Sequence, residues 1–412
     1  MKILWVSHLL PYPPKGGVMQ RSYNLLYQVS KDNEVDFIAL SQKSHHVRKG
    51  ASVEVGKDVL GEFCDVIDVM PIKSDSSIFR KHFNIAAGFV AREPYMVWWL
   101  RSKEFRKALA VAIEKTDYDV YYFDTLGLAQ YYELVAQKNG VKILNHHNIE
   151  SQLILRRSKK EKNIFKSFYY SVEAAKRQRY EKQMCPLFDH NVAVSELDRK
   201  RLEKITGQLS SSVVANGVDI EYFKPSGIEQ KRHRIIFIGG LTFYPNIDAI
   251  RFILGEVWGL LKEKFPEVEF YIIGRNPPKD ILNAAELDPS IVVTGFVEDI
   301  RTLIEEATVY VCPITDGGGT RLKILDALAM GKAIVAHPIA CEGIDVTDGK
   351  DVLFARTPQE YVDCITQLFY DEKLRNRLGE NGRELIVYGY SYESIGKSIR
   401  HMMTLLLSNK YD

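Results

Sequence analysis

Three consecutive glycines followed by two basic residues make the part of this sequence best suited to hold an anion. Glycine lets backbone amides approach an anion closely, and amides at a helix N-terminus point towards it. We expect the amides of Gly318 and Gly319 to do this, Thr320 to be the helix N-cap, and Arg321 to offer a two-pronged contact to a diphosphate. The run reads Asp316-Gly317-Gly318-Gly319-Thr320-Arg321-Leu322-Lys323-Ile324-Leu325-Asp326.

The charged residues of this run have two interpretations. Arg321 and Lys323 oppose the helix dipole at an N-terminus, a placement that a bound anion would compensate. Lys323 and Asp326 are three apart on one helix face, so a plain ion pair worth about 0.2–0.5 kcal/mol is the alternative.

Two further motifs stand where predicted strands end in the first half of the chain. Gly16 and Gly17 follow the first strand and precede a helix at Met19–Ser30, which favours a second anion contact or, equally simply, a flexible connector. His147, in Asn145-His146-His147-Asn148, could donate to a hydroxyl or stabilise developing charge. A hydrogen-bonded surface histidine is the simpler interpretation. A metal site would need more ligands than the histidines and Glu150 provide.

The second half repeats this placement of polar and glycine residues after strands. Gly240 follows one predicted strand, Arg275 a second and Val297 a third. Ligands of parallel α/β folds bind beyond the carboxyl ends of the strands, so we expect these positions to line a binding site.

The elements that would position these residues alternate between short apolar strands and longer helices, which predicts parallel sheets covered by helices. The stretch Phe223–Gly227 reads as a linker. We therefore expect an α/β protein of two Rossmann-like domains, residues 1–222 with a returning helix at 392–410, and residues 228–388. The strands expected are Lys2–Ser7, Val35–Leu40, Val66–Met70, Val120–Phe123, Lys142–Asn145, His190–Val194, Ser212–Val214, Arg234–Ile238, Glu269–Ile273, Ile291–Val293, Val309–Cys312, Ala333–Ala336 and Val352–Phe354.

Composition narrows the cellular context. The 412 residues hold five scattered cysteines without a CxxC pair, which favours reduced thiols in a cytoplasm. We expect no signal peptide, and no apolar run reaches the ~18 residues that a spanning helix needs. The net charge is only +2, yet residues 1–225 hold 34 Lys+Arg against 26 Asp+Glu.

Two segments of the first half mix basic and aromatic residues. Residues 156–182 carry ten basic and three acidic side chains, and Ile78–Leu100 combines Phe, Tyr and Trp with Arg and Lys. Such segments suit an anionic membrane interface, although a solvated helix face and ordinary core aromatics would explain them as well.

In this order, the motifs resemble those of the family-4 glycosyltransferases. The resemblance covers nearly the whole chain and is carried by the Gly16-Gly17 opening, His147-Asn148-Ile149-Glu150, Val192–Ser195, Val214–Asp219, Phe237–Gly240, Gly295-Phe296-Val297, the glycine-rich turn and Leu325–Val335.

The resemblance implies a GT-B architecture, two Rossmann-like domains facing across a cleft, and retention of anomeric configuration. It further implies that the second domain binds a nucleotide-sugar donor and the first binds the acceptor. Gly16 and Gly17 would then face the donor diphosphate, His147 the reacting sugar, Asp326 the ribose, and the main chain at Val297 the base.

The sequence departs from that family at two places. Gly318 replaces the first of two glutamates spaced eight apart, and Gly240-Leu241-Thr242-Phe243-Tyr244 lacks the usual basic residue. Arg321 and Lys323 would then supply the positive charge. No Asp-x-Asp follows a strand suitably, so we expect no cofactor and no essential metal.

We therefore expect a cytoplasmic glycosyltransferase, peripheral to the membrane, in cell-surface polysaccharide or glycoconjugate biosynthesis. Its expected partners are a nucleotide-sugar donor, a glycan or lipid-linked acceptor and an anionic membrane surface, and no nucleic acid. A nucleotide-sugar epimerase or hydrolase and a catalytically impaired binding protein stay open as alternatives. The sugar, the base and the acceptor are left undefined by the motifs.

Overall fold

The computed structural model describes residues 1–42, 52–72, 91–316 and 319–411, which fall into two compact units. Unit 1 is Met1–Ala215 together with Ile395–Asp412, and unit 2 is Asn216–Ser394. The domain boundaries drawn from the sequence, and the acceptor and donor roles attached to them, stay predictions.

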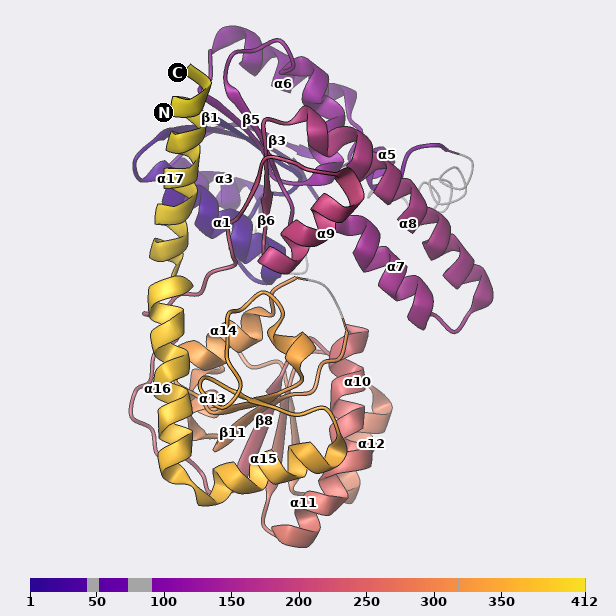
Figure 1. Ribbon diagram of the computed structural model, residues 1–412, viewed down its shortest axis with the longest axis vertical. Helices are drawn as coiled ribbons and strands as arrows, with labels where there is room; N and C mark the ends of the chain where they lie inside the picture. The colour runs from indigo at the N-terminus through magenta and orange to yellow at the C-terminus, as the bar shows by residue number, and fades with distance from the viewer. Residues whose placement is uncertain (43–51, 73–90, 317–318, 412) are drawn as a thin grey trace. The chain divides into compact units, whose positions relative to one another are not determined.

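Unit 1 is built on a parallel sheet of seven strands in the order β3-β2-β1-β4-β5-β6-β7 (Figure 1). The central strands are buried and rich in Val, Ile and aromatic residues, as parallel strands covered on both faces must be. The strands are β1 (Lys2–Ser7), β2 (Glu34–Ser41), β3 (Asp65–Pro71), β4 (Val120–Phe123), β5 (Val141–Asn145), β6 (His190–Ala193) and β7 (Ser211–Val213).

Side chains of β1 alternate between two cores, one on each face of this sheet. Leu4 and Val6 belong to one, while Ile3 and Trp5 belong to the other, where Trp5 stacks on Tyr122 of β4 at 3.9 Å between ring centroids. The helical elements are α1 (Gly17–Ser30), α3 (Val53–Gly61), α5 (Tyr95–Trp99), α6 (Lys103–Lys115), η2 (Leu126–Leu134), α7 (Glu150–Lys160), α8 (Ile164–Met184), η3 (Cys185–Leu187), α9 (Glu196–Thr206) and, returning from the C-terminus, α17 (Tyr392–Tyr411).

Unit 2 has a six-stranded parallel sheet in the order β10-β9-β8-β11-β12-β13. Its strands are β8 (Arg234–Ile238), β9 (Glu269–Ile273), β10 (Ile291–Gly295), β11 (Val309–Cys312), β12 (Ile334–Ala336) and β13 (Leu353–Phe354). Its helical elements are α10 (Tyr244–Phe252), η4 (Ile253–Val257), α11 (Trp258–Lys264), α12 (Lys279–Leu287), α13 (Arg301–Glu306), α14 (Leu322–Ala329), η5 (Pro338–Cys341), α15 (Pro358–Tyr370) and α16 (Glu372–Gly389).

Each sheet reverses its strand order once, and the reversal fixes where a ligand can bind. In unit 1 the chain turns from one direction to the other between β1 and β4, and in unit 2 between β8 and β11. Loops leaving neighbouring strands there run to opposite sides and open a crevice at the carboxyl ends. Residues that follow these four strands and their neighbours are therefore placed to contact a ligand.

The expected fold class, two Rossmann-like α/β domains, is confirmed. Five predicted strands have the bounds seen in the structure, and the other eight differ by one or two residues. The last helix begins at Tyr392 as predicted and ends at Tyr411, one residue beyond the predicted end. That the domains face one another across a cleft stays a prediction. In the part of the chain that the structure describes, no helix is long and apolar enough to cross a membrane.

Candidate functional site

Two glycines allow the ends of β8 and β9 to pack against polar groups in unit 2. A Cβ on Gly239 would lie 2.4 Å from Lys323 Nζ, and a Cβ on Gly274 would lie 1.9 Å from the Gly239 carbonyl oxygen. A side chain at either position would therefore push this edge apart. Gly240, the predicted binding residue, has open space where its Cβ would be.

The close approach at Gly239 is made by a short polar chain. Lys323 Nζ donates to Asn246 Oδ1 at 2.7 Å, and Asn246 Nδ2 donates to the Gly240 carbonyl oxygen at 2.8 Å. The ammonium also lies 4.5 Å from the centroid of the Phe237 ring. Burial lowers the pKa of Lys323 to about 8. A positive charge is thus held at the carboxyl end of β8 at some cost in solvation.

Asp326 lies one turn further along α14. Burial raises the pKa of its carboxyl to about 8, against the opposing influence of Lys323. Within the described residues, the hydrogen bond of the Lys323 ammonium goes to Asn246, not to Asp326. The simple i,i+3 ion pair that the spacing allowed is therefore not what holds Lys323 in place.

Thr320 is not the helix N-cap, which corrects the sequence-based expectation. Helix α14 begins at Leu322, so Arg321 occupies the N-cap position and no side chain caps the helix. The guanidinium of Arg321 instead folds back on its own loop, donating to the carbonyl oxygens of Gly319 at 2.6 Å and Asp316 at 3.0 Å. The Thr320 hydroxyl is buried and has no hydrogen-bond partner among the described residues.

Arg321 therefore contacts the main chain at both Asp316 and Gly319, as well as contributing charge there. Gly317 and Gly318 lie outside the described residues, so the predicted amide contact at Gly318 stays a prediction. A buried neighbour of the loop was missed by sequence reasoning: Asp316 accepts a hydrogen bond from the Tyr244 hydroxyl at 2.6 Å. Tyr244 opens α10, so the loop after β11 and the helix after β8 are tied together.

Arg275 and Phe296 form an exposed platform at the ends of β9 and β10. The Arg275 guanidinium carbon lies 3.8 Å from the centroid of the Phe296 ring, and 54% of Phe296 is exposed. Planar guanidinium and aromatic groups stacked in this way suit a flat ligand such as a base. Val297, predicted to offer its main chain to a base, is the next residue along the chain.

In unit 1, His147 is held by a carboxylate that sequence reasoning did not single out. His147 Nε2 lies 3.3 Å from Asp124 Oδ1, and only 7% of the histidine side chain and none of the aspartate side chain is exposed. Neither ring nitrogen of His147 makes a hydrogen bond in the described part of the chain, so its contact with Asp124 is that of an ion pair. A histidine oriented by a buried carboxylate is suited to donating a hydrogen bond or stabilising developing charge.

The buried charge of Asp124 is stabilised by further donors. Ser22 Oγ donates to one carboxylate oxygen at 2.5 Å, and Asn145 Nδ2 donates to the other at 3.0 Å. Arg21 in turn donates to Asn145 Oδ1 at 3.1 Å. Burial alone would raise the pKa of Asp124, but His147, His8 and the hydrogen bond from Ser22 outweigh it and the pKa is lowered. The carboxylate is therefore ionised.

A sequence signal for Asp124 did exist, because it directly follows the predicted strand Val120–Phe123. His146, which precedes His147 in the chain, has a structural contact of its own. His146 is buried, its Nε2 lies 3.0 Å from Asn191 Oδ1, and burial lowers its pKa to about 4. Glu150 forms an ion pair with Arg177 at 2.6 Å, which engages its carboxylate away from the histidines.

Gly16 and Gly17 stand at the start of α1, the first helix after β1. Gly16 is the N-cap and has φ +96° and ψ 151°, a conformation that residues with a Cβ rarely adopt. Both glycines are exposed, and no acidic residue lies in the first turn. The exposed amides at this helix start fit the predicted anion contact.

One group of residues has the geometry of a metal site. The ligand atoms of His8, Asp124 and His147 lie within 4.8 Å of one another. Two histidines and a carboxylate suit a divalent transition metal, but the Asp124 oxygens already accept hydrogen bonds from Ser22 and Asn145. The arrangement is therefore explained without a metal, and the expectation of none stays a prediction.

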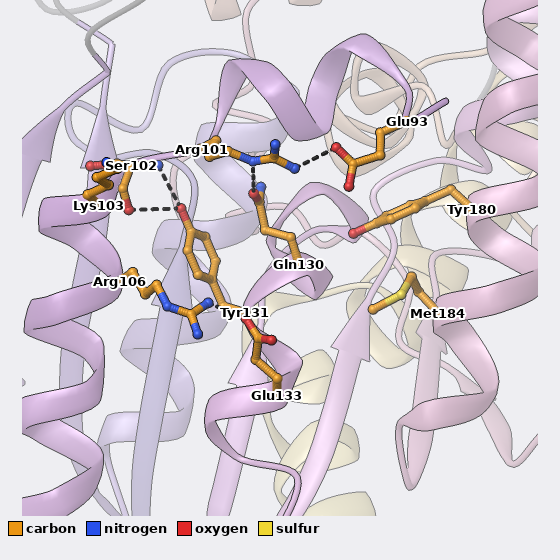
Figure 2. A pocket seen from close by; sticks show the side chains of 10 residues that line it. All are labelled: Glu93, Arg101, Ser102, Lys103, Arg106, Gln130, Tyr131, Glu133, Tyr180 and Met184. Atoms are coloured by element: carbon orange, nitrogen blue, oxygen red, sulfur yellow. Dashed lines mark hydrogen bonds and ion pairs between the residues drawn. The ribbon is translucent and has the colours of Figure 1, made fainter. Parts of the chain in front are cut away.

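A surface pocket of unit 1 contains none of the predicted site residues (Figure 2). Four of its five charged side chains form two pairs: Arg101 with Glu93 at 2.5 Å, and Arg106 with Glu133. The Tyr131 hydroxyl in its wall donates to the Leu100 carbonyl oxygen.

The chain is similar in sequence to known glycosyltransferases. Residues 232–371 match the sequence model of the family "Glycosyl transferases group 1". An uncharacterized glycosyltransferase of Methanocaldococcus jannaschii is 24% identical over 237 residues, 53% of this chain and 59% of that protein. The chain thus spans somewhat more than half the length of this relative.

Solved structures resemble the whole chain. Sucrose-phosphate synthase from Thermosynechococcus elongatus has a TM-score of 0.71 at 13% identity and covers 99% of this chain and 100% of its own. The Anabaena protein HepE, solved in complex with UDP, has a TM-score of 0.68 at 15% identity and covers 98% and 100%. At these identities the likeness establishes the fold, which is GT-B-like.

Proposed function

We propose that this GT-B-like chain moves a sugar from a nucleoside-diphosphate-sugar donor to a glycan or lipid-linked acceptor, because residues 232–371 match the sequence model of the group 1 glycosyl transferases. The reaction would retain anomeric configuration and serve the synthesis of a cell-surface polysaccharide or glycoconjugate. The single observation that carries the proposal is the cluster of Lys323, Asn246 and Gly239 at the β8 strand end, inside the matched region.

Unit 2 would bind the donor. The Lys323 ammonium and the amides of the glycine-rich turn would hold the diphosphate, with Arg321 keeping the turn closed. The platform of Arg275 and Phe296 would lie against the base. Asp326 would accept from ribose hydroxyls. Its raised pKa means that it can also donate near neutral pH.

Unit 1 would bind the acceptor and assist the reacting sugar. The bond from the anomeric carbon to the diphosphate oxygen breaks, and a bond to the acceptor oxygen forms on the same face. The acceptor proton passes to the leaving phosphate oxygen, so the balance needs no further reactant. His147, held by Asp124, would hydrogen-bond to the reacting sugar, and the amides of Gly16 and Gly17 would contact the diphosphate.

The lipid-linked class of acceptor fits a peripheral position on the cytoplasmic face of a membrane. The surplus of basic residues lies in the first half of the chain, which the proposal assigns to the acceptor. Anionic lipids attract such surfaces within about a Debye length.

The test is release of nucleoside diphosphate from UDP-, GDP-, ADP- and dTDP-sugars, with and without membranes, beside thermal stabilisation by each donor. We expect one nucleotide to stabilise the protein, with UDP the first candidate because HepE was solved with it. We also expect release that rises when acceptor membranes are added. Stabilisation without release would indicate a binding protein, and a changed sugar without release would indicate an epimerase.

A further inference from the structure

Helices α7 and α8 form a hairpin that projects from unit 1 (Figure 1). Residues 161–163 make the turn between them. Ser158 Oγ lies 2.5 Å from Ser171 Oγ, and the Ser167 hydroxyl donates to the Ser158 carbonyl oxygen at 2.7 Å. Arg157 lies over the Tyr170 ring at 4.5 Å. These contacts hold the hairpin closed up to its tip.

The tip presents large apolar side chains to solvent. Ile164, Phe165 and Phe168 are 74%, 79% and 63% exposed. They belong to the first turns of α8, whose start is well formed, since Asn163 Oδ1 accepts hydrogen bonds from the amides of Phe165 and Lys166 at 3.1 Å each. The exposure is therefore not the result of a frayed helix end. Large apolar side chains gathered in this way mark an interaction surface.

Basic residues surround this apolar tip. Between Arg156 and Phe168 the chain holds six basic residues and one acid, Glu161. Lys159, Lys162 and Lys166 are exposed. The start of α8 adds the positive end of a 21-residue helix dipole. The tip thus combines apolar groups that can enter a lipid interface with charges that meet phosphate headgroups.

We propose that the α7–α8 tip docks on an anionic membrane surface, inserting Ile164, Phe165 and Phe168 among headgroups while Lys159, Lys162 and Lys166 contact lipid phosphates. This deepens the proposed function and rests on it for its purpose, which is to hold the enzyme beside a lipid-linked acceptor. An anionic bilayer fits better than a second copy of the chain, because two such tips would bring like charges together.

Binding to vesicles tests the docking directly. Purified full chain is sedimented with vesicles of phosphatidylcholine alone and of phosphatidylcholine mixed with phosphatidylglycerol, at low and high salt. We expect binding to the anionic vesicles only, weakened by salt. Lys159→Gln/Lys162→Gln/Lys166→Gln should weaken it roughly a hundredfold, since each basic residue near the surface contributes about fivefold. Phe165→Ser/Phe168→Ser should weaken it about tenfold or more.

Matched controls lie in unit 2. Leu287 is 87% exposed, and Lys279, Lys350 and Lys373 are exposed, so Leu287→Ser and Lys279→Gln/Lys350→Gln/Lys373→Gln change the same chemistry away from the tip. Vesicle binding that both sets weaken equally, or that the tip variants leave intact, overturns the proposal. So does loss of a dimer in the tip variants without vesicles, which would make the tip a self-association surface.

The docking can fail separately from the proposed function. Thermal stabilisation by nucleotide does not involve the tip, so every tip variant should keep it. Intact nucleotide binding without any vesicle binding would refute the docking alone. Vesicle binding without nucleotide stabilisation would support the docking and refute the donor site.

Discussion

Replacing Lys323 by methionine gives the sharpest test of the donor site in unit 2. The methionine keeps the apolar stem beside Phe237 and removes the ammonium that reaches Asn246 at 2.7 Å. A charge-assisted contact to a diphosphate contributes about 1.5–3 kcal/mol. The dissociation constant for the preferred nucleoside diphosphate should therefore rise by about 10- to 150-fold.

A buried lysine of unit 2, Lys332, supplies the matched control. Lys332 is 2% exposed, its Nζ donates to the Glu305 carbonyl oxygen at 3.0 Å, and burial lowers its pKa to about 8 as well. Lys332→Met should lower the melting temperature and leave nucleotide affinity unchanged. Isothermal titration calorimetry on both variants, with melting curves to confirm folding, makes the comparison.

The pH dependence gives a second signature of Lys323. Because its pKa is lowered to about 8, the ammonium loses its proton above that pH, and affinity of the wild type for the diphosphate should fall there. Lys323→Met should lack this fall. Equal nucleotide affinity in wild type and Lys323→Met, or an equal loss of affinity in Lys332→Met, would refute the assignment.

Three further outcomes are expected. Asp124→Asn and His147→Ala should each slow turnover tenfold or more while sparing nucleotide affinity, and the double variant should lose little more, because one residue acts through the other; full additivity would contradict this. The stability of the wild type should decline as pH rises from about 4 to 8, because the raised pKa of Asp326 lets the folded state keep a proton that the unfolded chain releases. Asp326→Asn should therefore reduce the fall in melting temperature over that pH range. Activity should survive chelation by EDTA, and a loss restored by added Zn²⁺ or Mn²⁺ would instead make His8, Asp124 and His147 a metal site.

The strands could be predicted because each carries its own signal. A parallel strand buried on both faces is a continuous apolar run, and residues such as Trp5 and Phe237 in such runs are fully buried. The Rossmann-like order follows from the alternation of strands and helices. Short edge strands such as β13, two residues long, have weaker signals, and their bounds differed accordingly.

The site was less predictable because its contacts join distant parts of the chain. Asp124 contacts Ser22, Asn145 and His147. A local sequence pattern cannot predict the contact with Ser22, which lies 102 residues away in the chain. The error at Thr320 has the same cause. Arg321 folds back onto carbonyl oxygens of its own loop, which moves the helix start to Leu322, and propensity at Thr320 does not contain that information.

The charges of Asp124 and Lys323 at the strand-order reversals differ in how they are stabilised, and the difference supports the assignment of the donor to unit 2. The Asp124 carboxylate has His147, Ser22 and Asn145 as partners, and its pKa shifts towards the charged form. The Lys323 ammonium has an amide for its hydrogen-bond partner, and its pKa shifts towards the neutral form. Unit 1 therefore holds a charge that the protein already balances, whereas unit 2 holds one that a bound anion would balance. A diphosphate placed against Lys323 would favour the charged form of the ammonium.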